Sequence, residues 1–168
     1  MTSTNLPKSL VLMGAGKMGG AMLEGWLEGG IATEHLTVID PNPSEVLKEL
    51  ATRHGFRLNP PLGDVAPPEA LVLGIKPQGL DAAAEGFAAL AGPKTLVVSI
   101  LAGKTIANLR ARAPHATAFV RAMPNLPASV QRGVTGVAAS VEVSPSQRVM
   151  TTALLSGIAQ TIADCVTR

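Results

Sequence analysis

Residues 9–19 read Ser-Leu-Val-Leu-Met-Gly-Ala-Gly-Lys-Met-Gly, an apolar run that leads into the pattern G-x-G-x-x-G. We expect the apolar run to form a β-strand and a helix to begin directly after the second glycine. In that setting Gly14 permits a tight turn, Gly16 lets the backbone approach a pyrophosphate, and Gly19 lets the helix pack closely on its strand. The N–H groups and the dipole at the helix N-terminus attract an anion. The stretch therefore predicts a dinucleotide-binding turn.

A second apolar run, residues 36–39, ends at Asp40. An acidic residue about 20 positions after the glycines accepts hydrogen bonds from the ribose hydroxyls of NAD. The alternative, an ordinary glycine-rich turn, leaves Asp40 unexplained. A carboxylate repels a 2′-phosphate, and no arginine lies nearby in the sequence, since Lys48 and Arg53 are distant. These residues favour NADH, although Lys48 could fold back on a phosphate.

Composition limits the class of protein. The 168 residues suit one domain, 1–168, and with 46% apolar and 2% aromatic residues its core is aliphatic. The net charge of +2 is scattered, with no basic stripe, which argues against nucleic acid as a partner. One cysteine, Cys165, excludes an intrachain disulfide and is typical of the reducing cytoplasm. No window approaches the ~18 apolar residues of a membrane span, and residues 1–8 lack the apolar core of a signal peptide.

Apolar runs alternate with helical patterns along most of the chain. We expect strands at 9–13, 36–39, 56–58, 70–75, 94–100, 117–121, 134–139 and 160–164. We expect helices at 17–28, 44–54, 78–90, 105–112 and 146–156. Strands that are apolar throughout indicate a parallel sheet covered on both faces. The sequence thus predicts an α/β, doubly wound, mostly parallel, Rossmann-like sheet, with the last strands added at one edge.

In such sheets ligands bind beyond the carboxyl ends of the strands. Lys76, which precedes Pro77, could reach a ribose hydroxyl or a phosphate, or it could be a plain surface lysine. Small residues in 99–105 would let the backbone approach a flat ring. Asn125 lies in a stiff loop between two prolines that could present its amide, or the loop could be a simple connector. His35, His54 and His115 lack metal-ligand spacing, so we expect no metal site.

Three segments in this order resemble pyrroline-5-carboxylate reductase. They are Gly74-Ile75-Lys76-Pro77, Ser99 to Thr105, and Arg121 to Gly133. The third is the most specific, with matches at Arg121, Met123, Pro124, Asn125, Pro127, Val130 and Gly133. The resemblance extends from about residue 9 to the end of the chain. Gly74 stands where the family usually has alanine, a change that we expect to be mild.

The resemblance implies an NAD(P)H-dependent oxidoreductase of proline biosynthesis that reduces 1-pyrroline-5-carboxylate to L-proline, with NADPH as the cofactor of many relatives. It also implies the cofactor-binding residues, which are Met13, Gly14, Ala15, Gly16, Lys17, Met18, Gly19, Asp40, Pro41, Asn42, Gly74, Ile75, Lys76, Pro77, Ile100, Leu101 and Ala102. Asn125 is expected at the floor of the active site. No residue is assigned as the catalytic acid.

Members of that family continue into an all-helical domain that forms the dimer and holds the substrate. Because this chain ends about where that segment would begin, we expect it to supply the cofactor half and to be a monomer or a weak associate, whereas full-length relatives are homo-oligomers. Two alternatives stay open. A β-hydroxyacid-type dehydrogenase would need a lysine on a later helical domain, and the segment 123–125 favours the reductase instead. A dinucleotide-binding module without catalysis would bind NAD(P)H but show no imine-dependent oxidation.

Overall fold

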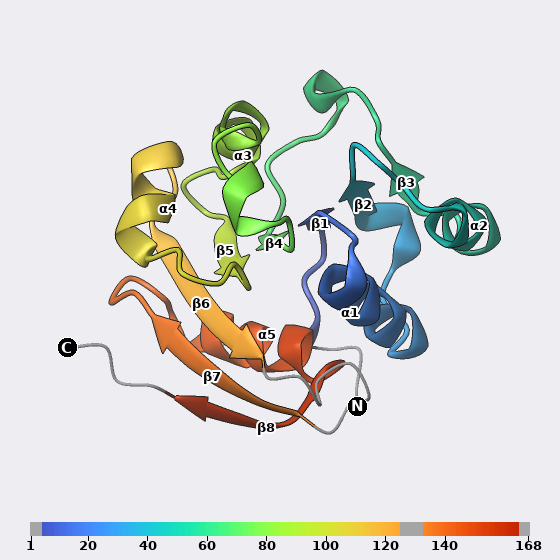
Figure 1. The fold of residues 1–168 in the computed structure, drawn as a ribbon. Helices are drawn as coiled ribbons and strands as arrows, with labels where there is room; N and C mark the ends of the chain where they lie inside the picture. The colour runs from blue at the N-terminus through green and yellow to red at the C-terminus, as the bar shows by residue number, and fades with distance from the viewer. Residues whose placement is uncertain (1–4, 125–132, 165–168) are drawn as a thin grey trace.

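The computed structural model describes residues 5–124 and 133–164, and these form one eight-stranded sheet with helices around it (Figure 1). The strands are β1 (Leu10–Met13), β2 (Leu36–Ile39), β3 (Arg57–Leu58), β4 (Ala70–Leu73), β5 (Leu96–Ser99), β6 (Ala118–Pro124), β7 (Gly133–Ala139) and β8 (Ala159–Asp164). The helices are α1 (Lys17–Glu28), α2 (Glu45–His54), α3 (Ala84–Leu90), α4 (Ile106–Arg112) and α5 (Pro145–Leu155). Short 3-10 turns are η2 (Thr33–His35), η3 (Leu62–Asp64) and η4 (Pro77–Gly79).

The order of the strands is β3-β2-β1-β4-β5-β6-β7-β8, and neighbouring strands from β3 to β6 are parallel. The chain first winds outward from β1 to β3 and then crosses back to add β4, β5 and β6 on the other side. This is the doubly wound arrangement that the sequence predicts, and the prediction is confirmed. The winding reverses between β1 and β4, which opens a crevice at the carboxyl ends of these two strands.

The sheet has apolar side chains on both faces because helices cover both. On one face Leu10 and Leu12 join a core cluster with Trp26 of α1, and α2 and α5 contribute to the same cluster. On the other face Val11 and Met13 pack with residues of α3 and α4. Successive residues of a strand therefore point into two different cores, which is why the central strands are continuously apolar instead of alternating.

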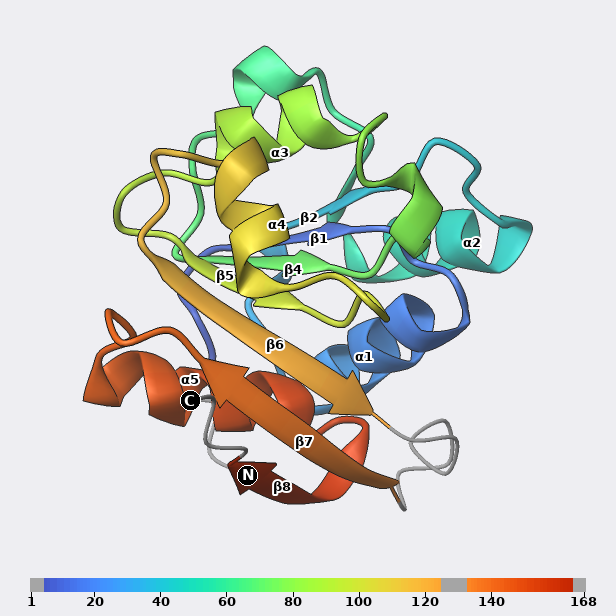
Figure 2. The ribbon, with the colours of Figure 1, turned by 60° about the vertical axis from the view of Figure 1, so that its left-hand side comes forward.

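The last two strands extend the sheet beyond β6, as expected (Figure 2). Strand β7 runs antiparallel to β6, with Val120 opposite Ala139, and β8 runs parallel to β7. Helix α5 makes the crossover between β7 and β8. It packs on α1, where Trp26 Nε1 donates a hydrogen bond to the Leu154 carbonyl at 2.8 Å. This buried bond ties the edge of the sheet to the helix that follows the glycine loop.

Local sequence signals set most helix boundaries. The Ser44 side chain accepts a hydrogen bond from Leu47 N at the start of α2, and Gly55 ends that helix at φ 77°. Thr105 and Asn108 form a reciprocal capping box on α4. Side-chain caps of this kind satisfy N–H groups that the first turn of a helix leaves unpaired. The start and the end of α2 and the start of α4 can therefore be located from residue type alone.

The helix predicted at 78–90 is wrong in its first half. The segment begins as the 3-10 turn η4, continues as a turn through residue 83, and becomes α-helical only from Ala84. Gly79 weakens the helical start, and Arg112 of α4 holds the turn through a 2.7 Å bond from Nε to Asp81 Oδ1. Leu80 and Phe87 still pack in the same core. The apolar spacing therefore predicted these buried positions correctly, although the backbone is not one helix.

Candidate functional site

A cavity of about 830 Å³ lies at the carboxyl ends of β1, β2 and β4. The loop after each of these strands contributes to it, together with the segment after β3 and the start of α3. The lining residues are Met13, Gly14, Gly16, Ile39, Asp40, Pro41, Asn42, Asn59, Pro60, Leu62, Gly74, Ile75, Lys76, Gly79, Ala82, Ala83, Glu85 and Gly86. The cavity occupies the place where a doubly wound sheet binds its ligand.

The three glycines of the first turn differ in the space around them. Gly14 has φ +90°, and a Cβ added there would lie 2.6 Å from Ile75 N. A Cβ on Gly19 would lie 2.1 Å from the Gly14 carbonyl oxygen. A Cβ on Gly16 would meet no atom of the described residues within 4 Å, because Gly16 borders open space. Gly14 and Gly19 are thus required for the turn and its packing, whereas Gly16 leaves room for a ligand.

The first turn of α1 presents backbone donors beside that open space. Gly16 is the N-cap of this helix of 12 residues, and neither a side-chain cap nor an acidic residue occupies its first turn in the described part of the chain. The first N–H groups of a helix have no partner within the helix, and they carry a partial positive charge. This end of α1 therefore has the chemistry of an anion cradle.

Asp40 lines the cavity and is in direct contact with the glycine loop. Its Oδ2 accepts a hydrogen bond from Ala15 N at 2.9 Å, and its Oδ1 accepts one from Asn42 N at 2.9 Å. The carboxylate is half-buried, and each oxygen retains a lone pair for a further donor. It is thus a fixed acceptor at the point where the sequence predicts a ribose.

The turn after β4 forms the wall opposite Asp40. A Cβ on Gly74 would lie 2.7 Å from the Gly14 carbonyl oxygen, because the glycine loop and this turn are in contact. A Cβ would fit there only if one of the two turns moved, and the expectation that glycine is a mild change at this position stays a prediction. The exposed residue Lys76 borders the cavity just beyond that contact.

Charges in the cavity are few. Lys76 is the cation among its lining residues, and Asp40 and Glu85 supply carboxylates. Lys48, considered as a partner for a phosphate, is paired with Glu45 at 2.6 Å on the exposed side of α2. Among the lining residues, therefore, no cation next to Asp40 is available to bind a phosphate on the ribose.

Other predicted residues are not among those that line this cavity. These are Ala15, Lys17, Met18, Gly19, Pro77, Ile100, Leu101 and Ala102. Leu101 is buried in the core that α3 and α4 cover, whereas Ala102 is exposed after β5. Asn125 lies outside the described residues.

Sequence reasoning missed the segment after β3. Asn59, Pro60 and Leu62 line the cavity, and Asn59 contacts the backbone of Asp40. The available signal was that residues 57–58 form a strand, so the next residue lies at the same carboxyl edge. The first turn of α3, which contributes Glu85 and Gly86, was also missed because the helix was expected to begin earlier.

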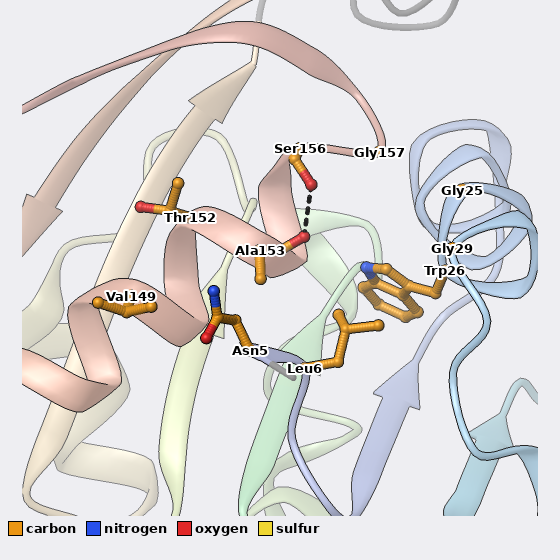
Figure 3. Close-up of a pocket in the computed structure, with 10 residues that line it drawn as sticks. All are labelled: Asn5, Leu6, Gly25, Trp26, Gly29, Val149, Thr152, Ala153, Ser156 and Gly157. Atoms are coloured by element: carbon orange, nitrogen blue, oxygen red, sulfur yellow. Dashed lines mark hydrogen bonds between the residues drawn. The ribbon is translucent and has the colours of Figure 1, made fainter. Parts of the chain in front are cut away.

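A further cavity of about 340 Å³ lies between α1 and α5, and no residue of the glycine loop lines it (Figure 3). No charged side chain is among the residues that line it, and two of its hydroxyl groups bond to nearby carbonyls. Ser156 Oγ donates to the Ala153 carbonyl at 2.7 Å, and Thr152 Oγ1 donates to the Arg148 carbonyl at 3.2 Å. The described residues that line this cavity thus offer no positive charge to the phosphates of a dinucleotide.

Two features are absent from the described residues, 5–124 and 133–164. No helix among them has both the length and the apolar character to cross a membrane. No group of three or more His, Cys, Asp or Glu side chains in the same residues is arranged to hold a metal ion.

Residues 9–103, more than half of the chain, match the model of the family described as NADP oxidoreductase, coenzyme F420-dependent. The chain belongs to this family. The matched region covers β1 to β5 and every described residue that lines the large cavity, so the family signature and the site coincide.

Relatives within this oxidoreductase family and its structural neighbours carry a more specific name. A pyrroline-5-carboxylate reductase from Pasteurella multocida is 34% identical over 157 residues, which are 92% of this chain and 57% of the relative. A solved pyrroline-5-carboxylate reductase from Coxiella burnetii superposes with a TM-score of 0.84 at 22% identity, over 95% of this chain and 59% of that one. The Plasmodium falciparum pyrroline carboxylate reductase with NADP bound superposes with a TM-score of 0.74 at 20% identity, over 94% and 57%.

These likenesses confirm the resemblance seen in the sequence, and the two solved structures support the fold. The chain spans somewhat more than half the length of the curated relative and of the two solved chains.

Proposed function

We propose that this chain is the cofactor-binding half of a pyrroline-5-carboxylate reductase, which reduces 1-pyrroline-5-carboxylate to L-proline with NADH or NADPH. The observation that carries the proposal is the cavity of about 830 Å³, in which the glycine loop and Asp40 lie side by side at the carboxyl ends of β1 and β2. The 34% identity to a relative of that name supports the choice of reaction.

The residues present fit a dinucleotide. The open space beside Gly16 and the uncapped N-terminus of α1 suit a pyrophosphate, and Asp40 suits the hydroxyls of the adenosine ribose. Lys76 and the turn 74–77 would border the nicotinamide half, with the backbone of 100–102 beyond it. We propose Asn125 for the substrate side, on the resemblance alone.

The chain contributes binding and orientation. When bound, the reduced nicotinamide supplies the hydride that is added to the imine carbon, while a proton reaches the ring nitrogen and the oxidised cofactor leaves. The rigid contact between Gly14 and the turn at Gly74 fixes the distance between the two walls of the cavity. Holding two reactants in a productive orientation accounts for a large part of many rate enhancements.

The direct test is titration of the chain with NADH and with NADPH, followed by cofactor fluorescence. Replacing Gly16 by leucine places a side chain in the open space, so we expect it to abolish binding while thermal unfolding changes little. Gly63 is equally open, lies outside the cavity lining and is the matched control, since Gly63→Leu should bind the cofactor as the parent does. Failure of the parent chain to bind either cofactor would overturn the proposal.

The choice of substrate needs a second measurement. Oxidation of NAD(P)H that depends on pyrroline-5-carboxylate, and not on a β-hydroxyacid product pair, identifies the reductase. The chain alone, and the chain mixed with a helical domain from a full-length relative, are compared in the same assay. Absence of imine-dependent oxidation in both, with binding retained, would leave a dinucleotide-binding module.

We further propose that residues 1–168 act as one nucleotide-binding unit in the cytoplasm, with the small imine and not nucleic acid as partner. The scattered net charge of +2 supports this, and so does the presence of a single cysteine. We propose that the chain alone is a monomer or a weak associate, which light scattering at micromolar concentration tests.

A further inference from the structure

Asn59 has an unusual backbone conformation at the edge of the cavity. Its φ of 49° is in the left-handed region, and it is the non-glycine residue with positive φ in the described part of the chain. Its backbone N donates to the Val38 carbonyl at 2.9 Å, which continues the pairing of the two-residue strand β3 with β2. Asparagine tolerates this region better than most residues, and such a conformation marks a place where the surroundings hold the chain.

The side chain of Asn59 binds the backbone of Asp40 on both sides. Asp40 N donates to Asn59 Oδ1 at 2.8 Å, and Asn59 Nδ2 donates to the Asp40 carbonyl at 2.8 Å. One amide thus satisfies both polar groups of the Asp40 backbone, as a residue of a neighbouring strand would. Only asparagine or glutamine carries a donor and an acceptor in this arrangement, because aspartate would offer the carbonyl oxygen no donor.

This clamp determines where the Asp40 carboxylate lies. With its backbone held by Asn59, Asp40 directs Oδ2 to Ala15 N and Oδ1 to Asn42 N, both at 2.9 Å. The carboxylate is thereby fixed between the glycine loop and the β2–α2 loop. Without the clamp, the exposed end of β2 could turn and release the carboxylate into solvent.

We propose that Asn59 is a positioning residue that holds the Asp40 carboxylate at the ribose subsite and so favours a free 2′-hydroxyl over a 2′-phosphate. The inference rests on the proposed cofactor site. A carboxylate held in place accepts ribose hydroxyls and repels a phosphate, since like charges at close range are unfavourable. Lys76 is the cation among the lining residues, and Lys48 is paired with Glu45. The position of Asp40 therefore dominates the charge at this subsite.

The test measures the dissociation constants of NADH and NADPH for the chain and for the variant Asn59→Gly, which keeps access to positive φ but loses the clamp. We expect NADH to weaken relative to NADPH by about three- to tenfold, the range set by the net contribution of a hydrogen bond. Arg57→Ala is the matched control. Arg57 lies on β3 outside the cavity lining and donates two 3.2 Å bonds to the Asp64 carbonyl, so its loss loosens the same segment without touching Asp40.

A double-mutant cycle separates positioning from general loosening. In the background of Asp40→Asn, which keeps the backbone contacts but removes the negative charge, Asn59→Gly should no longer change the ratio of the two dissociation constants. An equal loss for both cofactors, the same ratio change in Arg57→Ala, or a ratio change that persists in Asp40→Asn would each overturn the inference. If the parent chain binds a cofactor but Asn59→Gly leaves the ratio of the two dissociation constants unchanged, the proposed function stands and the proposed role of Asn59 is overturned. If the parent chain binds neither NADH nor NADPH, both the proposed function and the proposed role of Asn59 are overturned.

Discussion

Gly19 and Gly20 are adjacent glycines of α1 with opposite predicted responses to alanine. A Cβ on Gly19 would lie 2.1 Å from the Gly14 carbonyl oxygen, whereas a Cβ on Gly20 would lie 3.5 Å from the Ala15 carbonyl oxygen, an ordinary contact. To restore a normal distance at Gly19, α1 would have to move roughly 1 Å away from the glycine loop in a close-packed region. Both substitutions gain the same intrinsic helix preference, so the comparison isolates the clash.

The expected change in the free energy of unfolding is the sum of two opposing contributions. Replacing glycine by alanine inside a helix stabilises a protein by roughly 0.5–1 kcal/mol. Overpacking costs about 1–3 kcal/mol, and we take the upper end because the contact is with backbone that cannot rotate aside. We therefore expect Gly19→Ala to lower the free energy of unfolding by about 2 kcal/mol and Gly20→Ala to raise it by about 0.5–1 kcal/mol. At this chain length the melting temperature should fall by about 4–8 °C for Gly19→Ala.

The assay is urea unfolding followed by the emission of Trp26, with circular dichroism as a second probe. Trp26 is the only tryptophan of the chain, is 1% exposed, and lies on α1 itself. Its emission therefore reports on the helix that carries both substitutions. Equal stability of the two variants, or a greater loss in Gly20→Ala, would refute the close approach of α1 to the loop.

Four further outcomes are expected. Gly74→Ala should lower both stability and NAD(P)H affinity, because its Cβ would meet Gly14 O at 2.7 Å, whereas Gly63→Ala in open space should change neither in the same unfolding and titration assays. Trp26→Phe should cost about 1–3 kcal/mol in a circular dichroism unfolding curve, since it leaves the Leu154 carbonyl without its donor, and an unchanged midpoint would contradict this. Ser144→Ala should cost about 1 kcal/mol, because Ser144 and Gln147 form a capping box on α5, and urea unfolding measures the loss. The hydrogen bond from Arg110 holds the pKa of Glu142 below its ordinary 4.5. The ionised Glu142 therefore stabilises the fold above the unfolded pKa, and this contribution is lost as pH falls through the folded pKa. In Glu142→Gln the free energy of unfolding should depend less on pH between about pH 6 and pH 3.

Local patterns were sufficient for the order and type of nearly all elements. Continuous apolar runs predicted the buried strands, and Ser44 and Thr105 predicted the helix starts at which the structure shows their caps. The glycine loop and Asp40 were located for the same reason, since each belongs to a short pattern at the end of a strand. The helix at 78–90 failed because a glycine and an ion pair from α4 outweighed a correct apolar spacing.

The sequence alone determined which residues form strands, where α2 and α4 begin, and at which end of the sheet we propose a dinucleotide to bind, because these depend on periodicity and on caps a few residues apart. Only the tertiary structure decided that Asn59 clamps Asp40, 19 residues away, and that the Gly14 carbonyl lies against Gly74. Such contacts join segments that are distant along the chain, and their distances depend on how the strands pack. No local pattern contains that information, which is why the residues that shape the site emerged only from the fold.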